Sequence, residues 1–199
     1  MFRYLTAAFL GIIMVTACAD DDPAYSPKPR MYPRVEYPAH AYEWVEKPDC
    51  GFKFRKLASS TIESKERFFN EEIDSECWFN LVYPDFDATV YYTYYPIDNR
   101  KTYSSLVKES FRMAYEHSKM ATSIQEEPLL GDRQNHVGMS FDLKGPVASP
   151  YQFFLSDTTN HFIRGSLYFN TRPNPDSLRP VLAYVREDLD TLIQSFTWY

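Results

Sequence analysis

The chain has 199 residues, 44% of them hydrophobic and 17% aromatic, and its 21 Lys and Arg against 27 Asp and Glu give a formal charge of −6. This length suits one domain with appendages and is sufficient to bury a core. The apolar content excludes a wholly disordered chain, and the six Gly exclude a collagen repeat. Because phosphate binding needs clustered Lys and Arg, an acidic chain without a long basic run excludes nucleic acid as the main partner.

The first 17 residues have the form of a secretory signal peptide. Arg3 is their only charged residue, and residues 5–15 are almost entirely apolar. A transmembrane helix needs about 20 apolar residues to cross the bilayer core, and this run ends earlier, at Thr16. We therefore expect residues 1–17 to be a lipoprotein signal peptide that is removed. The alternative, a short buried N-terminal helix, has only a polar tract after it to pack against.

Cys18 ends this segment in the motif Val15-Thr16-Ala17-Cys18, which resembles the lipobox of bacterial lipoproteins. Its thiolate is the nucleophile that takes a diacylglyceryl group, and cleavage before it frees an amine for a further chain such as palmitate. Two or more acyl chains hold a water-soluble domain stably at a membrane. The motif predicts a cell-envelope lipoprotein, at the outer membrane rather than the inner one, facing the periplasm or the cell surface. The alternative is a free Cys at an ordinary secretory cleavage site.

Residues 18–45 are predicted to be the lipidated Cys and a Pro-rich tether. Asp20, Asp21 and Asp22 form either a solvated spacer or a signal of the kind that exports lipoproteins to the surface of Bacteroidota-type bacteria. The following prolines disfavour helix and central strand and favour an extended chain; they are residues 23, 27, 29, 33 and 38. We place one globular domain after this tether, over residues 46–199.

The globular domain is predicted to be α+β. Apolar residues recur at helical spacing over residues 103–126 and over residues 176–196. Strand patterns cover residues 51–57, 78–83, 88–95, 136–143, 151–156 and 161–169. The short turns in the second group of strands favour an antiparallel meander. We expect an antiparallel sheet of about five to six strands covered by two amphipathic helices.

One predicted strand, residues 88–95, contains four tyrosines. Alternation places Tyr92 and Tyr94 on one side of this strand and Tyr91 and Tyr95 on the other. Two of these tyrosines are expected to face the core, and the other two to lie on an exposed sheet face. Exposed aromatic side chains occur both in protein interfaces and in sites where sugars stack. The alternative to a binding surface is that these tyrosines are ordinary half-buried residues of a sheet.

Cys50 and Cys77 remain as an even pair when Cys18 is acylated. Secretion places them in an oxidising compartment, where a disulfide is the default. The bond would join the start of the first predicted strand to the start of the strand at Trp78. The alternative is two unpaired buried thiols. We expect no metal site, because the four His lack ligand spacing and no second Cys pair is present.

No arrangement in the sequence predicts catalysis, and we expect neither an enzyme, nor a cofactor, nor a small-molecule substrate. The segment 138–142 has Asp142 where a nucleophile elbow requires a second Gly. A triad of Ser140, His161 and Asp157 can be written down, but a chain of this length permits one by chance. No Gly-rich phosphate-binding loop is present.

Candidate partner-binding residues gather around the last two predicted strands. Asp157, His161 and Arg164 lie at the turn between them and at the start of the second, with Gln152 and Tyr168 further along. An Asp157–Arg164 pair would pin this hairpin, which is a structural role. The alternative is an exposed polar patch of all five residues that recognises a partner.

Several stretches together resemble the gliding-motility lipoprotein GldD family. They are residues 28–38 (KPRMYPRVEYP), 77–92 (CWFNLVYPDFDATVYY), 145–169, which end in HFIRGSLYF, and 172–178 (RPNPDSL). The resemblance covers nearly the whole chain after the signal segment. It implies an envelope lipoprotein of Bacteroidota-type bacteria that is needed for gliding motility and tied to type IX protein secretion, and it brings no catalytic residues.

The leading hypothesis is therefore a non-catalytic lipoprotein of the motility and type IX secretion machinery that acts through contacts with other envelope proteins. A second hypothesis is a module that binds glycan, peptidoglycan or lipid through the Tyr-rich sheet. A concave, aromatic-lined pocket would favour the second, and a sheet covered by both helices would not. A cell-wall hydrolase is the third, and it would require a deep cleft with convergent ionisable groups.

Overall fold

A computed structural model describes residues 34–64, 67–68, 71–72, 77–130 and 136–199. The predicted signal peptide, Cys18 and the acidic run at residues 20–22 lie outside these residues. The chain divides into two units, Met1–Val35 and Glu36–Tyr199, and the architecture below is that of the second. Among the residues described, no helix has the length and apolarity to cross a membrane.

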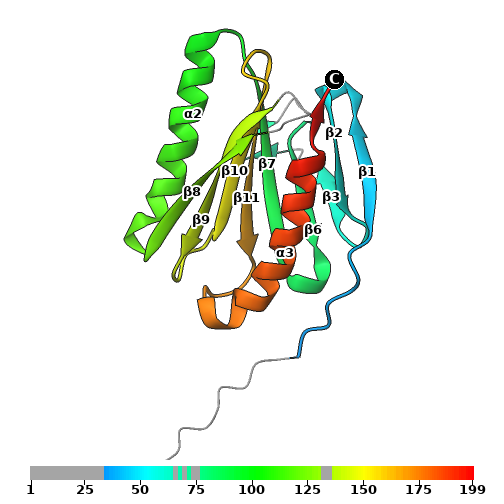
Figure 1. Cartoon of the computed structure of the whole chain (residues 1–199), viewed down its shortest axis with the longest axis vertical. Coiled ribbons are helices and arrows are strands. Elements are labelled where there is room, and N and C mark those ends of the chain that lie inside the picture. Colours follow the sequence, from blue (N-terminus) through cyan, green and yellow to red (C-terminus); the bar gives the residue numbers. More distant parts are fainter. Residues whose placement is uncertain (1–33, 65–66, 69–70, 73–76, 131–135) are drawn as a thin grey trace, which may run out of the picture. The chain divides into compact units, whose positions relative to one another are not determined.

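The second unit is built on a seven-stranded antiparallel sheet with the order β3-β6-β7-β11-β10-β9-β8 (Figure 1). Its central strands are consecutive hairpins, apart from the β7–β11 pairing, which runs from Ala88 with Phe169 to Pro96 with His161. The bounds are β3 Thr61–Ser64, β6 Phe79–Tyr83, β7 Ala88–Pro96, β8 Ser123–Leu130, β9 Val137–Lys144, β10 Tyr151–Ser156 and β11 His161–Phe169. A two-residue pair, β4 (Arg67–Phe68) and β5 (Glu71–Glu72), lies between β3 and β6 in the chain.

A second sheet joins the two ends of this unit. In it, β2 (Phe52–Leu57) pairs with β1 (Tyr42–Lys47) on one side and with β12 (Thr197–Trp198) on the other. The helix α3 (Pro175–Ser195) leads into β12 and is tied to β2, since the Arg55 backbone N–H donates to Ser195 Oγ at 2.9 Å. Asn174 caps α3 and Pro175 occupies its first turn, as expected for a helix start.

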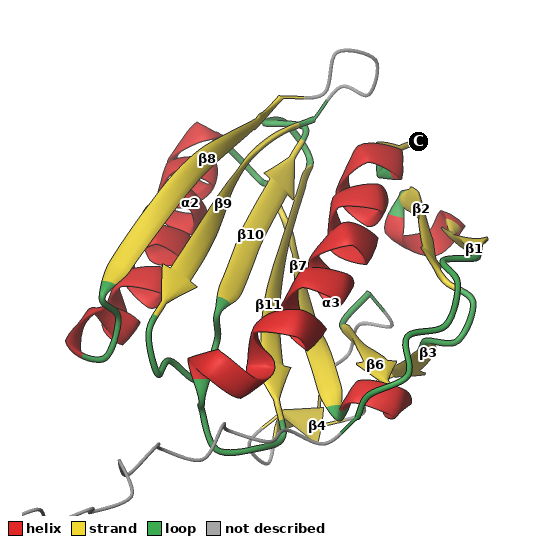
Figure 2. Ribbon diagram, turned by 60° about the horizontal axis from the view of Figure 1, so that its bottom comes forward, coloured by secondary structure: helices red, strands yellow, loops and turns green. Residues whose placement is uncertain are grey.

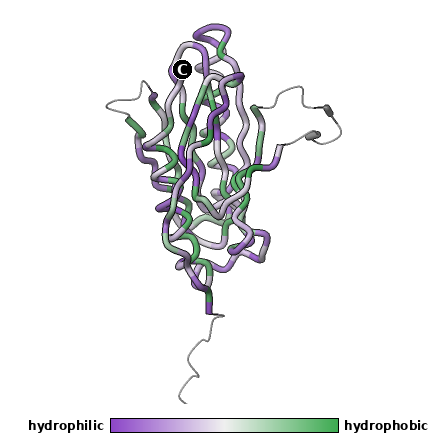
Figure 3. Tube along the Cα trace, turned by 90° about the vertical axis from the view of Figure 1, so that its right-hand side faces the viewer, coloured by the Kyte–Doolittle hydropathy of each residue, from purple (hydrophilic) through white to green (hydrophobic). Residues whose placement is uncertain are grey.

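One face of the seven-stranded sheet, which we call the packed face, is covered by α3 and by β2. Its side chains alternate along each strand and are buried, and they include Leu81, Tyr83, Val90, Tyr92, Phe153, Leu155, Ile163 and Leu167. Hydrophobic and hydrophilic positions alternate along the trace (Figure 3), which is the pattern of strands with one buried side. Aromatic rings fill the layer beneath α3: Phe54 lies 5.8 Å from Phe79 and 6.0 Å from Phe196.

The other face carries α2 (Arg100–Tyr115), so the two helices lie on opposite sides of the sheet (Figure 2). Asn99 caps α2 by accepting the backbone N–H groups of Lys101 and Thr102. The helix packs on a core cluster drawn mainly from β9, β10 and β11, which includes Phe141, Leu143, Phe154 and Phe162.

The fold class is confirmed as α+β with antiparallel sheets and two helices, and two details differ from the prediction. The main sheet has seven strands, where about five to six were expected, and a second sheet of three is present. The helix predicted over residues 103–126 is wrong over residues 116–126. It ends at Tyr115 and is followed by a 3-10 turn, η3 (Glu116–Lys119), and then by β8.

The error over β8 has a physical cause. Ala121 and Ile124 pack against the same cluster as the helix does, so their spacing imitates a continuing helical stripe. Thr122 instead donates its backbone N–H to Lys144 O at 2.8 Å and starts the pairing of β8 with β9. Pro128 is accommodated because β8 is an edge strand, where a missing N–H breaks no ladder.

Candidate functional site

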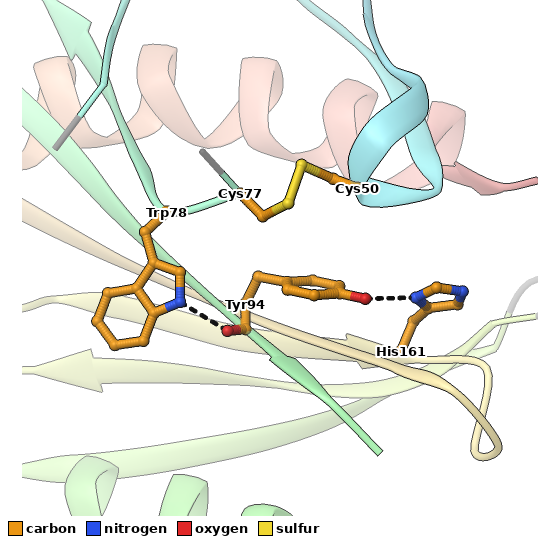
Figure 4. Close-up of a disulfide and its surroundings, with 5 residues drawn as sticks. All are labelled: Cys50, Cys77, Trp78, Tyr94 and His161. Carbon is orange, nitrogen blue, oxygen red and sulfur yellow. Dashed lines mark hydrogen bonds between the residues drawn. A yellow bond between two sulfur atoms is a disulfide. The ribbon is translucent and has the colours of Figure 1, made fainter. Parts of the chain in front are cut away.

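The disulfide predicted between Cys50 and Cys77 is present, with 5.5 Å between the Cα atoms. It joins η1 (Pro48–Cys50) to the residue before Trp78, beside β6 (Figure 4). Gly51 follows with φ 74°, a left-handed conformation that favours glycine, and it turns the chain into β2. The bond therefore fixes the N-terminal hairpin to the main sheet.

His161 belongs to this structural corner rather than to an exposed patch. Its Nδ1 lies 2.6 Å from the Tyr94 hydroxyl, and its ring stacks on Trp198 at 5.1 Å (Figure 4 shows the Tyr94 bond). A Cβ on Gly51 would lie 3.0 Å from the imidazole Cε1. His161 thus links β11 and β7 with the C-terminal strand and the disulfide loop.

Asp157 shapes the turn between β10 and β11. Its Oδ1 accepts the backbone N–H groups of Thr159, Asn160 and His161 at 3.0, 2.8 and 2.8 Å. Burial acts to raise the pKa of Asp157, but these three donors outweigh it and hold the pKa below its usual value. The pair expected between Asp157 and Arg164 is replaced by this backbone cap, and Arg164 bonds to Gln152 instead.

The remaining candidates, Arg164, Gln152 and Tyr168, do lie together, on the side of the sheet that carries α2. They are part of a surface that we call the open face, formed where the sheet extends past α2. It consists of the side chains of Trp78, Asn80, Thr89, Tyr91, Thr93, Tyr95, Gln152, Arg164, Ser166 and Tyr168. Tyr91 and Tyr95 are 38% and 37% exposed, so theirs is the exposed pair of the four tyrosines in β7.

The aromatic rings of the open face are arranged in two edge-to-face pairs. Tyr91 meets Tyr168 at 5.5 Å between centroids, and Trp78 meets Tyr95 at 5.3 Å. The Trp78 indole is held because its Nε1–H donates to Tyr94 O at 2.6 Å (Figure 4). These contacts orient the rings while leaving much of their surface accessible, which is the state in which aromatics bind partners.

Arg164 is the cation of the open face. Its Nη2 donates to Gln152 Oε1 at 2.6 Å, across the β10–β11 hairpin. Desolvation lowers the pKa of the Arg164 guanidinium, and Tyr168 and Tyr95 oppose that shift. Arginine stays charged even so, and a partly buried guanidinium with five N–H donors is a strong binding group.

Polar side chains lie in a row across the same face. Asn80, Tyr91, Ser166 and Gln152 are aligned by the pairing of β6, β7, β11 and β10. Asn80 Oδ1, Ser166 Oγ and Gln152 Nε2 are buried and have no hydrogen-bond partner within the described part of the chain. Buried polar groups are normally satisfied, so these three atoms are exceptions that lie beneath the exposed rings of the open face.

A hollow of about 540 Å³ opens beside Tyr91 and Tyr168. Thr89, Asp87, Phe169 and Asn170 complete its lining, and the Asn170 backbone N–H bonds to Asp87 O at 2.8 Å across the rim. Two aromatic rings beside a carboxylate, an amide and a hydroxyl can contact both the faces and the hydroxyl groups of a sugar.

The three residues of the hypothetical triad are each engaged elsewhere. Ser140 Oγ donates to Glu127 O at 3.3 Å, His161 bonds to Tyr94, and Asp157 caps its turn. The described residues also contain no group of three or more His, Cys, Asp or Glu placed to hold a metal ion.

A polar cluster that the sequence analysis missed attaches the leading segment to α3. His40 Nδ1 lies 2.7 Å from Asp188 Oδ1, and the Tyr42 hydroxyl donates to the same oxygen at 3.1 Å. Burial raises the pKa of Asp188, and the bonds from His40 and Tyr42 offset part of that rise. The available signal was an aspartate within the apolar stripe of the last helix, between Val185 and Leu192.

Comparison with known protein families shows to which family the chain belongs. The family described as Gliding motility lipoprotein GldD matches residues 22–198. The chain belongs to the GldD family. The resemblance inferred from the sequence is thereby confirmed, and GldD membership supports a membrane-anchored envelope location with a role in gliding motility. The GldD family is a motility lipoprotein family and is not a known enzyme family.

Two solved structures are similar over 80% of this chain. Cyanobacterial PsbP from Synechocystis sp. PCC 6803 has a TM-score of 0.48 and 12% identity, with 94% of its chain covered. The Ran-binding protein Mog1p from Saccharomyces cerevisiae has a TM-score of 0.43 and 10% identity, with 96% covered. No curated protein sequence matches the chain.

Proposed function

We propose that the protein is a non-catalytic component or accessory of the gliding motility and type IX secretion machinery. Acyl chains on Cys18 would hold it at the outer membrane, and the open face would bind another envelope protein. The family supports the motility role and the anchor. The observation that carries the docking role is the open face itself, because Trp, Tyr and Arg dominate the binding energy of protein interfaces.

The position of Arg164 strengthens this argument. It lies one strand away from Tyr95 and two residues before Ser166 on the same strand, so the cation is surrounded by aromatic and hydroxyl groups. A ring of aromatic side chains around a half-desolvated charge excludes water when a partner docks, and exclusion of water strengthens the central polar contact.

Photocrosslinking in native envelopes tests the docking surface. A photoreactive residue in place of Tyr95 is expected to capture a motility or secretion component, and Arg164→Ala should reduce that capture. Tyr115 on α2 is the matched control, because it is also a surface tyrosine, at 47% exposed. Equal capture from positions 95 and 115, or normal secretion and gliding with Arg164→Ala, would contradict the proposal.

Mass spectrometry and protease accessibility test the anchor. The mature chain is expected to begin at Cys18 and to carry acyl groups, and an unmodified thiol there would contradict the proposal. Protease treatment of whole cells that carry the native chain or an Asp20–Asp22 alanine variant separates a surface location from a periplasmic one. The set of accessible partners follows from that result.

A second candidate function is glycan or peptidoglycan binding, favoured by the hollow between Tyr91, Tyr168, Asp87 and Asn170. Soluble polysaccharides and peptidoglycan fragments titrated against the mature chain test it. Binding that is lost with Tyr168→Ala or Asp87→Ala and kept with Arg164→Ala would favour this candidate over protein docking.

A further inference from the structure

A separate apolar pocket lies between the loop that follows β9 and the first turns of α3. Its volume is about 240 Å³, and its walls include Leu143, Val147, Pro150, Pro173, Leu178 and Leu182. Leu143 and Val147 form buried parts of the wall, whereas Leu178 and Leu182 are only partly covered. Leu178 and Leu182 are four residues apart and so lie on the same side of α3. The pocket thus extends from the surface down to buried core residues.

The loop that forms one wall is held in a single conformation. The Leu143 N–H bonds to Pro150 O at 2.9 Å, and the Val147 N–H bonds to Gly145 O at 2.9 Å. Gly145 has φ 105°, and a Cβ there would lie 2.9 Å from Met120 O, so the turn requires glycine. The pocket is preformed, which is typical of small-molecule sites.

The inner walls are apolar, and the polar side chains of the lining are Lys144, Asn174 and Arg179. All three are exposed, and Asn174 Oδ1 already accepts the Ser177 backbone N–H at 3.4 Å. A docked peptide would need partners for its own backbone N–H and C=O groups. An aliphatic chain has no such groups, so an apolar pocket suits a segment of that kind.

Cations stand around the mouth. Lys144 and Arg179 belong to the lining, and Arg172 precedes the lining residue Pro173. Lys144 pairs with Asp142, which also accepts from Arg186, whereas Arg172 and Arg179 have no ion-pair partner among the residues described. The mouth therefore suits an anionic head group on an apolar chain.

The pocket also lies at the end of the unit where the chain leads toward Cys18. In Figure 1, the leading segment and the start of α3 are both at the lower end of the domain. That segment is held there, because the Tyr184 hydroxyl donates to Pro38 O at 2.9 Å. This is the end of the second unit that follows the tether along the chain.

We propose that this pocket binds one acyl chain of an anionic membrane lipid, with the head group beside Lys144, Arg172 and Arg179. The acyl chain enters between Leu178, Leu182 and Val147. This site is distinct from the open face, because no residue lines both of them. The lipid bound in this pocket gives the domain a second membrane contact besides the acyl chains on Cys18. The two contacts together set the orientation of the domain relative to the membrane.

Oleate, below its micellar concentration, is the first probe, titrated into the mature chain with Cys18→Ala. It should bind with one-to-one stoichiometry. Leu182→Trp fills the pocket and should weaken oleate binding at least tenfold. If that variant fails to fold, Leu178→Trp fills the pocket from the neighbouring turn of α3 and should have the same effect. Tyr91→Ala, on the open face, is the matched control and should leave the affinity unchanged. Unchanged oleate affinity in a folded Trp variant would overturn the proposal.

Vesicle binding and photocrosslinking distinguish an acyl chain of a membrane lipid from the protein's own acyl group as the occupant of the pocket. Arg179→Glu should weaken binding to phosphatidylglycerol vesicles several-fold and leave the weak binding to phosphatidylcholine vesicles unaltered. A photoreactive fatty acid should label residues 143–150 and 173–182, and labelling elsewhere would overturn the site. If the probe labels the Cys18→Ala chain but not the acylated chain in the same vesicles, the protein's own acyl group fills the pocket and the membrane-lipid proposal is wrong.

Discussion

The two faces of the seven-stranded sheet differ in how they use the same kind of residue. On the packed face, aromatic rings such as Tyr92 and Phe153 are buried under α3 and β2. On the open face, Tyr91 and Tyr95 come from the same strand as Tyr92 but keep more than a third of their surface exposed. Aromatic content alone therefore says little about binding. Which side of the strand a ring occupies decides whether it stabilises the fold or is available to a partner.

The largest expected effect tests that division directly. Phe54→Ala should lower the free energy of unfolding by about 3–5 kcal/mol, because it removes a buried ring and leaves a cavity. Tyr95→Ala, on the open face, should cost less than about 1 kcal/mol. Urea denaturation of both variants measures the difference. Similar losses would mean that the open face is part of the stabilising core.

The disulfide provides a second test of how the two faces differ, because it holds β2 over the packed face. The bond closes a loop with a sequence separation of 27 residues. A Cys50→Ser, Cys77→Ser double variant should lose about 3.5 kcal/mol by the chain-entropy relation. Thermal and urea unfolding of the native and double-variant chains give the value, and reduction of the native chain should reproduce it. A loss below about 1 kcal/mol would show that β2 needs no such fastening.

Two adjacent residues of β11 allow the faces to be compared within one strand. Gly165→Ala should destabilise by about 1–3 kcal/mol, because a Cβ there would lie 2.6 Å from the Phe153 ring on the packed face. Ser166→Ala should be neutral or slightly stabilising, since its buried Oγ has no partner among the described residues. Urea midpoints at constant m-value measure both changes, and the reverse order would refute the assignment of faces.

The smallest effect concerns pH. Burial raises the pKa of Asp188, so the folded chain binds that proton more tightly than the unfolded chain does. The contribution of Asp188 to stability is therefore fully present below its ordinary pKa and declines as pH rises toward the raised value. The decline amounts to about 1.4 kcal/mol for each tenfold difference in proton affinity between the folded and unfolded chains.

Denaturation of the native chain and of Asp188→Asn between pH 3 and 7 isolates this contribution. The difference in unfolding free energy between them should fall with rising pH across the lower part of that range and then level off. A difference that grows with pH would show that the bonds from His40 and Tyr42 outweigh burial.

Much of the fold follows from local pattern. The alternation of Tyr91 to Tyr95 assigns β7 its two faces, and the apolar stripe of residues 178–196 locates α3 within one residue at each end. The Cys50–Cys77 bond follows from an even count in a secreted chain. In each case the signal is contained in one short segment.

The failures came where distant segments decide. β8 resembles a helix extension until β9 supplies its partner, and β12 consists of two residues that are a strand only because β2 is there. β1 begins at Tyr42, within the segment assigned to the tether. The structure places His161 and Arg164, two of the candidate partner-binding residues, on different faces of the sheet. This could have been predicted from the sequence, because residues three apart face opposite sides of one strand.

The pairing of β2 with β12 has a consequence for how the chain matures. Synthesis and translocation deliver Phe52 and Phe54 long before Thr197 and Trp198, yet these segments complete the same small sheet. Until α3 and β12 have been synthesised, the aromatic side chains of β2 remain exposed to water. A fusion attached after Tyr199 would lie beside Gly51, whose carbonyl accepts the Tyr199 N–H at 2.9 Å.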